Sequence, residues 1–267
     1  MDTKTFNEFR RIVYEKSGIR LDETKMSLVT ARVGKRLRML GIADHKSYLK
    51  HLVSDDTGEE IVEFLNVIST NVTNFFREPS HFEVLDNILR KSIAEGKRRL
   101  RLWSAACSSG EEPFTMAMVA AEACDGDNAI DIKILATDIS TKILAKSCDG
   151  VYTEAQMEPV PSLLRRKYFE EVKRNGVSCF RVRAELRQMV TFKRLNLACP
   201  PFPMRGPLDV AFCRNVMIYF DEEVRKRLVS DIHRLLRPGG FLMVGHAETL
   251  TGLQSGFNLV HPAVYVK

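Results

Sequence analysis

Residues 99–123 read RLRLWSAACSSGEEPFTMAMVAAEA and decide the fold of this chain. The stretch predicts a buried strand over 100–105, a turn of small residues over 106–110, and then a helix, in which Pro113 fits the first turn because its missing N–H is not needed there. A turn without bulky side chains lets a ligand approach the backbone, and the helix N-terminus offers free N–H groups. Taken alone, the stretch also fits an ordinary strand–helix connection in any α/β protein.

A second apolar run, residues 130–137, ends in Asp138. In doubly wound sheets an acid at the end of the second strand can hold ribose hydroxyls, so the two features together favour an adenosine-containing ligand. The turn lacks the GxGxxG pattern, and the 28 positions from Gly110 to Asp138 exceed the roughly 20 that are usual for dinucleotides. A nicotinamide-dependent dehydrogenase is therefore the weaker alternative.

Composition limits the class of protein. The chain has 267 residues, 45% of them hydrophobic, which is enough for a sizeable core in one or two domains. It has no apolar run of about 18 residues and its polar start lacks a signal peptide, so we expect a cytoplasmic protein without membrane insertion. The six cysteines are scattered without a CxxC pair, which predicts reduced thiols and no metal site. The net charge of +6 indicates an acidic partner, either nucleic acid or a protein surface.

The first part of the chain is predicted to be all-helical. Residues 2–53 hold amphipathic patterns with Gly18 and Gly41 as helix stops, and a further helix covers 58–69. The segment 25–50 is strongly basic, with seven Lys or Arg against one acid. Side chains opposite the apolar stripe of its helix include Arg32, Lys35, Arg36 and Arg38. This face is either a solvated surface or a docking surface for an acidic helix or for phosphates.

Two polar segments are candidates for a ligand site. Residues 70–79, TNVTNFFREP, make a poor helix interior and predict a loop, either a plain linker or one folded over a polar ligand. The buried strand predicted over 208–213 ends at Arg214 and Asn215. Ligands bind at this end of the strands in open α/β sheets.

The rest of the chain predicts further strands. Residues 177–182 and 189–193 alternate like strands, which predicts a hairpin-like insertion. Two final strands are expected over 241–245 and 259–266. His246 follows the first of them and is expected to be a rim histidine, not a catalytic one.

Five motifs together resemble the chemotaxis receptor methyltransferases. They are TNVTNFFRE (70–78), WSAACSSGEEP (103–113), ATDIS (136–140), CRNVMIYF (213–220) and LRPGGFLMVGHAE (236–248). Members of this bacterial family transfer a methyl group from S-adenosylmethionine to glutamate side chains of chemoreceptors and release S-adenosylhomocysteine. The resemblance implies an α/β, class I methyltransferase domain over 79–267, with a Rossmann-like, mostly parallel seven-stranded sheet. It also implies an inserted antiparallel β subdomain at about 165–193 and a helical receptor-docking domain over 1–78.

The resemblance also implies the functional residues. The cofactor-binding positions are Asn71, Thr73, Arg77, Glu112, Asp138, Asn196, Leu197, Arg214 and Asn215. Arg77 and Tyr219 match positions close to the transferred methyl and are the expected catalytic residues. The receptor-docking residues are Arg32, Arg36 and Arg38, which would contact the cytoplasmic helical domain of a chemoreceptor.

Partner and assembly expectations also come from the resemblance. Some family members grip a pentapeptide at the receptor's C-terminus through a longer loop than the segment 173–183 offers, so we expect no such tether here. We also expect a monomer. We expect no binding to nucleic acid, because the sequence Arg214-Asn215-Val216-Met217 stands where amine methyltransferases carry an Asn/Asp-Pro-Pro-aromatic motif. A methyltransferase of another protein or of nucleic acid, and an adaptor that binds S-adenosylmethionine without turnover, remain alternatives. Detectable turnover would exclude the adaptor.

Overall fold

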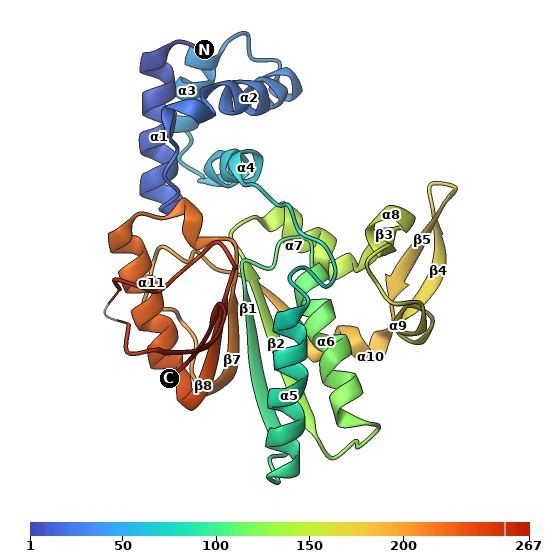
Figure 1. Ribbon diagram of the computed structural model, residues 1–267. Coiled ribbons are helices and arrows are strands. Elements are labelled where there is room, and N and C mark those ends of the chain that lie inside the picture. The colour runs from blue at the N-terminus through green and yellow to red at the C-terminus, as the bar shows by residue number, and fades with distance from the viewer. Residues whose placement is uncertain (254) are drawn as a thin grey trace.

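The computed structural model describes residues 1–253 and 255–267. A helical domain lies at one end of the molecule, an α/β domain at the other, and a small antiparallel sheet projects from the side of the α/β domain (Figure 1). Within the described ranges, no helix is long and apolar enough to cross a membrane. All six cysteines are free thiols, as predicted.

The N-terminal helices follow the predicted stops. They are α1 (Thr3–Ser17), the short 3-10 helix η1 (Glu23–Lys25), α2 (Met26–Leu40), α3 (His45–Val53) and α4 (Glu59–Ile68). Gly18 and Gly41 end α1 and α2 in the left-handed conformation, with φ of 70° and 67°. The aromatic rings of Phe9, Tyr48 and Phe64 meet in a separate core that holds these helices together.

The main sheet has seven strands in the order β6-β2-β1-β7-β8-β10-β9. Five neighbouring strands are parallel: β1 (Arg99–Ala105), β2 (Asp131–Asp138), β6 (Val190–Arg194), β7 (Leu208–Cys213) and β8 (Leu236–Val244). The last two, β9 (Asn258–His261) and β10 (Val264–Val266), are antiparallel. The chain builds outward from β1 in one direction and then returns to β7 on its other side. The carboxyl ends of β1 and β7 therefore form the switch point where doubly wound sheets bind ligands.

Two hydrophobic clusters cover the two faces of this sheet. Leu102 of β1 belongs to the cluster that includes α5 (Ser80–Ala94) and α6 (Glu111–Cys124). The next residue, Trp103, points to the opposite face, in the cluster with α11 (Glu222–Leu235). The predicted strand–turn–helix over 99–123 is confirmed as β1, its turn and α6, placed in the middle of the sheet.

The strand partners in the last third of the chain differ from the prediction. The small sheet has the order β3-β5-β4, made of β3 (Val151–Thr153), β4 (Phe169–Arg174) and β5 (Val177–Val182). The strand β6 pairs in parallel with β2 in the main sheet, so the expected hairpin of 177–182 with 189–193 is wrong. The inserted sheet begins and ends earlier than the predicted 165–193. Alternation of apolar residues shows that one face of a strand is buried, but it does not identify the strand's partner.

Short helices connect these strands. They are α7 (Thr141–Asp149), α8 (Glu154–Met157), α9 (Ser162–Tyr168), α10 (Ala184–Met189) and the 3-10 helix η2 (Met217–Tyr219). The segment 259–266, predicted as one strand, is instead the β9–β10 hairpin, which turns at Ala263 with a φ of 59°.

Candidate active site

One cavity of about 440 Å³ lies at the carboxyl ends of β1, β2 and β7. Its lining includes all nine positions predicted to bind the cofactor, together with Tyr219. Residues 17–32 of the helical domain also contribute to it, whereas the sequence predicted only Asn71, Thr73 and Arg77 from that domain. The lining residues from that domain include Ser17, Ile19, Arg20, Leu21, Lys25, Leu28 and Arg32.

The turn after β1 has an unusual backbone. Ala106, Ser108 and Gly110 all adopt positive φ angles, of 63°, 50° and 95°. A Cβ atom on Gly110 would lie 2.8 Å from the hydroxyl oxygen of Tyr152, so glycine is required on both conformational and steric grounds. The backbone N–H of Ser108 donates to Asp138 Oδ2 at 2.9 Å. The turn and the acid that were singled out in the sequence are thus in direct contact.

Asp138 closes β2 in a buried position. Its Oδ1 accepts a hydrogen bond from the backbone N–H of Ser140 at 2.9 Å, and burial raises the pKa of the carboxyl group. Each carboxylate oxygen can accept a second hydrogen bond, so Asp138 has acceptor capacity left for hydroxyl groups in the cavity. The Ser108 hydroxyl nearby is buried and has no partner among the described residues.

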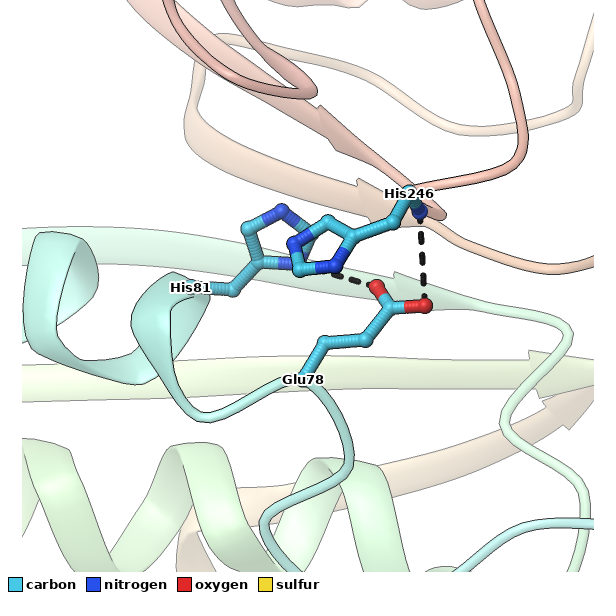
Figure 2. Close-up of side chains that lie close together, drawn as sticks. All are labelled: Glu78, His81 and His246. Atoms are coloured by element: carbon cyan, nitrogen blue, oxygen red, sulfur yellow. Dashed lines mark hydrogen bonds and ion pairs between the residues drawn. The ribbon is translucent and has the colours of Figure 1, made fainter.

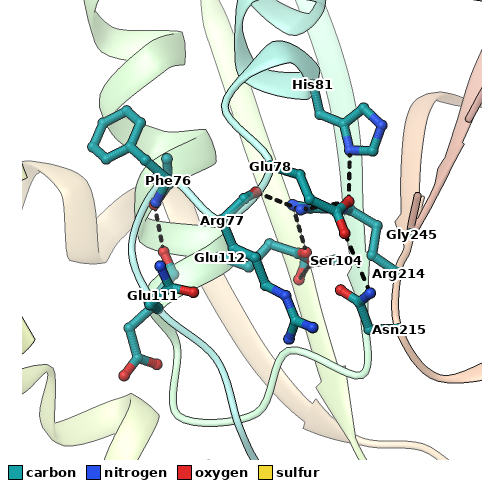
Figure 3. Close-up of polar contacts among 12 residues, drawn as sticks. Phe76, Arg77, Glu78, His81, Ser104, Glu111, Glu112, Arg214, Asn215 and Gly245 are labelled. Carbon is teal, nitrogen blue, oxygen red and sulfur yellow. Dashed lines mark hydrogen bonds and ion pairs between the residues drawn. The ribbon is translucent and has the colours of Figure 1, made fainter. Parts of the chain in front are cut away.

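A buried guanidinium joins three parts of the site (Figure 3). Arg214, whose side chain is 1% exposed, donates to Glu112 Oε2 at 3.3 Å and to Glu78 Oε2 at 3.1 Å. It also donates to the carbonyl oxygen of Arg77. Glu112 accepts a further hydrogen bond from the Ser104 hydroxyl at 2.6 Å. Since a buried cation must be paired, these contacts fix β7, α6 and the loop over 69–79 relative to one another.

The loop over 69–79 holds Arg77 between two strained residues. Phe76 and Glu78 have φ angles of 54° and 57°, a conformation that costs about 1–2 kcal/mol for each L-residue. The backbone N–H of Phe76 donates to the Thr115 hydroxyl at 3.3 Å, which ties the loop to α6. The Arg77 guanidinium donates to the carbonyl oxygen of Val72 at 2.9 Å and lines the cavity. Strain of this kind persists where the surrounding structure enforces it, often at functional sites.

Tyr219 ends η2 beside the helical domain. Its carbonyl oxygen accepts a hydrogen bond from the backbone N–H of Arg20 at 2.8 Å. Asn196, another predicted cofactor contact, donates through its side chain to the carbonyl oxygen of Lys16 at 2.9 Å. The end of α1 therefore docks directly against two of the predicted site residues.

Glu248 organises the loop that carries Asn215 and Tyr219, a role that the sequence analysis did not assign. Its carboxylate accepts four backbone N–H groups, from Gly245 at 2.6 Å, Asn215 at 2.7 Å, Met217 at 2.8 Å and Val216 at 3.0 Å. It thereby joins the ends of β7 and β8. The resemblance motif that ends at 248 contains this residue, but a sequence pattern does not show which backbone groups an acid will meet.

The three predicted docking arginines have different surroundings. Arg36 pairs with Glu60 through two hydrogen bonds, at 2.6 Å and 3.1 Å, and its side chain is only 15% exposed. Arg32 donates to the Ser69 carbonyl oxygen at 3.0 Å and lines the cavity. Arg38 is exposed and forms no ion pair with any residue that the structure describes. Of these three arginines, only Arg38 has a surface guanidinium without an ion pair among the described residues.

Glu78, His81 and His246 lie close together (Figure 2), and Glu78 is also the ion-pair partner of Arg214. Their ligand-type atoms are within 4.8 Å of one another, and His81 Nδ1 is 3.4 Å from Glu78 Oε2. Burial lowers the pKa of His81 to about 4, and the Arg214 charge acts in the same direction. We assign no metal to this cluster, because the guanidinium already pairs with the only carboxylate in it and would repel a cation.

Comparison with known proteins identifies the family. Residues 71–266 match the family model of the CheR methyltransferase SAM binding domain, and residues 4–69 match that of the CheR methyltransferase all-alpha domain. The chain belongs to the CheR methyltransferase family. It is 37% identical to a chemotaxis protein methyltransferase of Borreliella burgdorferi, over 96% of this chain and 92% of the relative. It is 38% identical to chemotaxis protein methyltransferase 2 of Pseudomonas aeruginosa (97% of this chain and 91% of the relative). It is 36% identical to the chemotaxis protein methyltransferase of Escherichia coli (97% and 89%).

The cavity of this CheR methyltransferase fits S-adenosylmethionine, the ligand that its family's larger domain binds. Asp138 offers acceptors for ribose hydroxyls, and the turn after β1 lines the cavity with the small side chains of Ala106 and Ser108. The partnerless Ser108 hydroxyl is a buried polar atom that a ligand can satisfy. Glu112 also lines the cavity, where its carboxylate is paired with Arg214.

Proposed function

We propose that this chain transfers the methyl group of S-adenosylmethionine to the side-chain carboxylate of glutamates on the cytoplasmic helical domain of chemoreceptors, giving methyl esters. The observation that carries the proposal is that one and the same cavity is lined by Asp138 and Glu112 and by the exposed cations Arg20 and Lys25 of the helical domain. A nucleoside site and a cationic approach for an acidic acceptor thus share one space. The related proteins named above are chemotaxis protein methyltransferases.

The reaction requires little acid–base chemistry from the protein. A glutamate carboxylate has an ordinary pKa of about 4.3 and is ionised at neutral pH, so it needs no strong base. S-adenosylmethionine supplies an electrophilic methyl group when bound. The work of the protein is to exclude water and to hold the acceptor in line, and such positioning contributes roughly 7–11 kcal/mol in favourable cases.

Arg77 and Tyr219 are the residues that we assign to this positioning. The Arg77 guanidinium uses one N–H on the Val72 carbonyl oxygen, which leaves further donors for an acceptor carboxylate. Tyr219 lines the same cavity, and its backbone is fixed by Arg20 and by the loop that Glu248 holds. The remaining cofactor contacts that we propose are those inferred from the sequence, and all of them line the cavity.

Receptor docking is assigned to the exposed side of α2, with Arg38 as its direct contact. Arg32 lines the cavity and donates to the Ser69 carbonyl oxygen, and Arg36 stabilises the helical domain through its ion pair with Glu60. A pentapeptide tether is not expected, because β4 and β5 are joined by the tight turn Asn175–Gly176. We further propose that the protein acts as a cytoplasmic monomer without nucleic acid, and that its docking domain spans residues 1–78.

The proposed function is tested by methyl transfer from labelled S-adenosylmethionine to receptor cytoplasmic fragments. The expected product is label on receptor glutamates that alkali releases, because a carboxyl methyl ester is base-labile and a methylated amine is not. Cofactor binding without label on any receptor would contradict the proposal and favour a binding adaptor. Alkali-stable label would indicate another acceptor group.

A further inference from the structure

The side chain of Asn215 is confined on three sides. Asn215 has a φ of 56°, and its backbone N–H donates to Glu248 Oε2 at 2.7 Å. Its amide Nδ2 donates to Glu78 Oε1 at 3.3 Å. A Cβ atom on Gly245 would lie 2.4 Å from that same Nδ2, so Gly245 leaves room for the amide and for nothing larger. The amide plane is therefore held at the cavity edge by its neighbours.

The identity of Glu78 decides which way the amide points. Burial raises the pKa of Glu78, but the Arg214 charge and the hydrogen bonds from Asn215 and the His246 backbone lower it by more, so the carboxyl group is ionised at neutral pH. An ionised carboxylate only accepts hydrogen bonds, so it selects the NH₂ side of the amide. The Oδ1 atom must then point away from Glu78, and Figure 3 shows it on the side where the Arg77 guanidinium lies. Oδ1 accepts no hydrogen bond from any described residue, while Asn215 lines the cavity.

We propose that Glu78 is a positioning residue that fixes the Asn215 amide with its oxygen toward the cavity, as an acceptor for a cationic donor at the methionine end of the cofactor. This inference rests on the proposed function, which places Asn215 in contact with the cofactor. The cationic donors available there are the ammonium group and the polarised C–H groups beside the sulfonium. A flipped amide would present N–H donors to these groups and repel them.

The test is an exchange of amide and carboxylate between the two positions. In Glu78→Gln, the amides of residues 78 and 215 can pair in either orientation. In Asn215→Asp, two carboxylates are brought together. Each single change is expected to weaken the binding of S-adenosylhomocysteine about tenfold or more, as measured by calorimetry. In the double variant Glu78→Gln/Asn215→Asp, the introduced amide donates to the introduced carboxylate, whose second oxygen faces the cavity. We expect the double variant to bind within about threefold of the unchanged protein, since the acceptor is restored.

Binding of both ligands identifies the donor. Equal losses for S-adenosylmethionine and S-adenosylhomocysteine indicate the ammonium group, which both carry, and a larger loss for S-adenosylmethionine indicates the sulfonium side. Glu83→Gln, on the exposed surface of α5, is the matched control and should leave both affinities unchanged. If Glu78→Gln unfolds the protein, Gly245→Ala displaces the amide without changing any charge and should weaken binding as well.

Two results would overturn the inference. One is a double variant that binds no better than the weaker single variant, and the other is a Glu78→Gln protein that binds within twofold of the unchanged protein. Asn215→Ala separates this failure from that of the proposed function. If Asn215→Ala weakens cofactor binding while the exchange gives no rescue, the cofactor contact stands and only the positioning role of Glu78 is lost.

Discussion

The guanidinium of Arg36 forms a fork-like ion pair with Glu60, with an Nη2–Oε2 distance of 2.6 Å and an Nε–Oε1 distance of 3.1 Å. The Tyr48 hydroxyl donates to the same carboxylate at 2.5 Å inside the helical domain. Burial raises the pKa of Glu60, but the hydrogen bonds from Arg36 and Tyr48 lower it by more. The carboxylate is therefore ionised in the folded protein and depends on its cation.

Arg36→Ala is expected to destabilise the protein, by about 3 kcal/mol, because it leaves a buried carboxylate without its cation. Urea unfolding measures this as a lower midpoint. Arg38→Ala is the matched control, since Arg38 is exposed and unpaired among the described residues, and its unfolding free energy should stay within about 0.5 kcal/mol. Equal stability of the two variants would remove the structural role that we give to Arg36.

Arg38→Ala is expected to act on the receptor instead. We expect a higher KM for receptor fragments, by about threefold to tenfold, with an unchanged KM for S-adenosylmethionine, because a single exposed cation contributes about 1 kcal/mol to an interface. Steady-state methylation at two ionic strengths measures the effect, which should shrink at high salt. A KM for the receptor that does not change would place the docking surface elsewhere.

The sequence predicted the parts of the site that depend on local pattern. Each of these parts lies at the carboxyl end of a buried strand: the turn from Ala106 to Gly110, the acid Asp138, and Arg214 after β7. Parallel strands bring their carboxyl ends to one edge of the sheet. A resemblance in sequence supplied Asn71, Thr73 and the other predicted cofactor positions, which no periodicity identifies.

What the sequence did not predict depends on contacts between distant segments. The hydrogen bond from Arg20 to the Tyr219 carbonyl oxygen brings the helical domain into the cavity wall, and no local pattern indicates it. The pairing of β6 with β2 was missed for the same reason. For Arg36, the helical periodicity correctly placed the side chain opposite the apolar stripe, but it could not show that Glu60 of another helix covers that position.

Arg77→Ala is expected to lower kcat about 100-fold while the protein stays folded, because the side chain makes one hydrogen bond, to the Val72 carbonyl oxygen, and lines the cavity. Turnover and the thermal midpoint measured on the same sample separate the two effects. Arg77→Lys keeps the charge without the planar fork and should recover only part of kcat. Unchanged kinetics in Arg77→Ala would exclude this residue from the reacting centre.

Glu248→Gln is expected to loosen the loop that carries Asn215 and Tyr219. The amide that replaces the carboxylate has a single acceptor oxygen, so it cannot accept all four backbone N–H groups, and we expect a loss of about 2 kcal/mol in unfolding free energy. Cofactor affinity should fall as well. Calorimetry and urea unfolding test both effects, with Glu83→Gln as the exposed control. A loss of stability without any loss of cofactor affinity would show that the loop keeps its place by other contacts.

The buried imidazole of His81 is expected to make the stability of the protein depend on pH. Burial lowers its pKa to about 4 in the folded protein, against about 6.5 when unfolded, while the groups facing it are Arg214, Glu78 and His246. Between about pH 4 and pH 6.5 the unfolded chain binds more protons at this position than the folded protein does. The stability that the neutral His81 gives to the folded protein is therefore complete above about pH 6.5 and is lost as the pH falls toward 4.

The expected loss from His81 is about 2 kcal/mol between pH 7.5 and pH 5. His81→Leu should remove this part of the pH dependence, because leucine does not titrate. The substitution leaves no hydrogen-bonding group without a partner, since the ring nitrogens of His81 have none among the described residues. Urea unfolding of the variant at both pH values, beside His261→Gln on the exposed strand β9, gives the comparison. The same pH dependence in His81→Leu and in the unchanged protein would mean that another group, not this buried imidazole, takes up the proton.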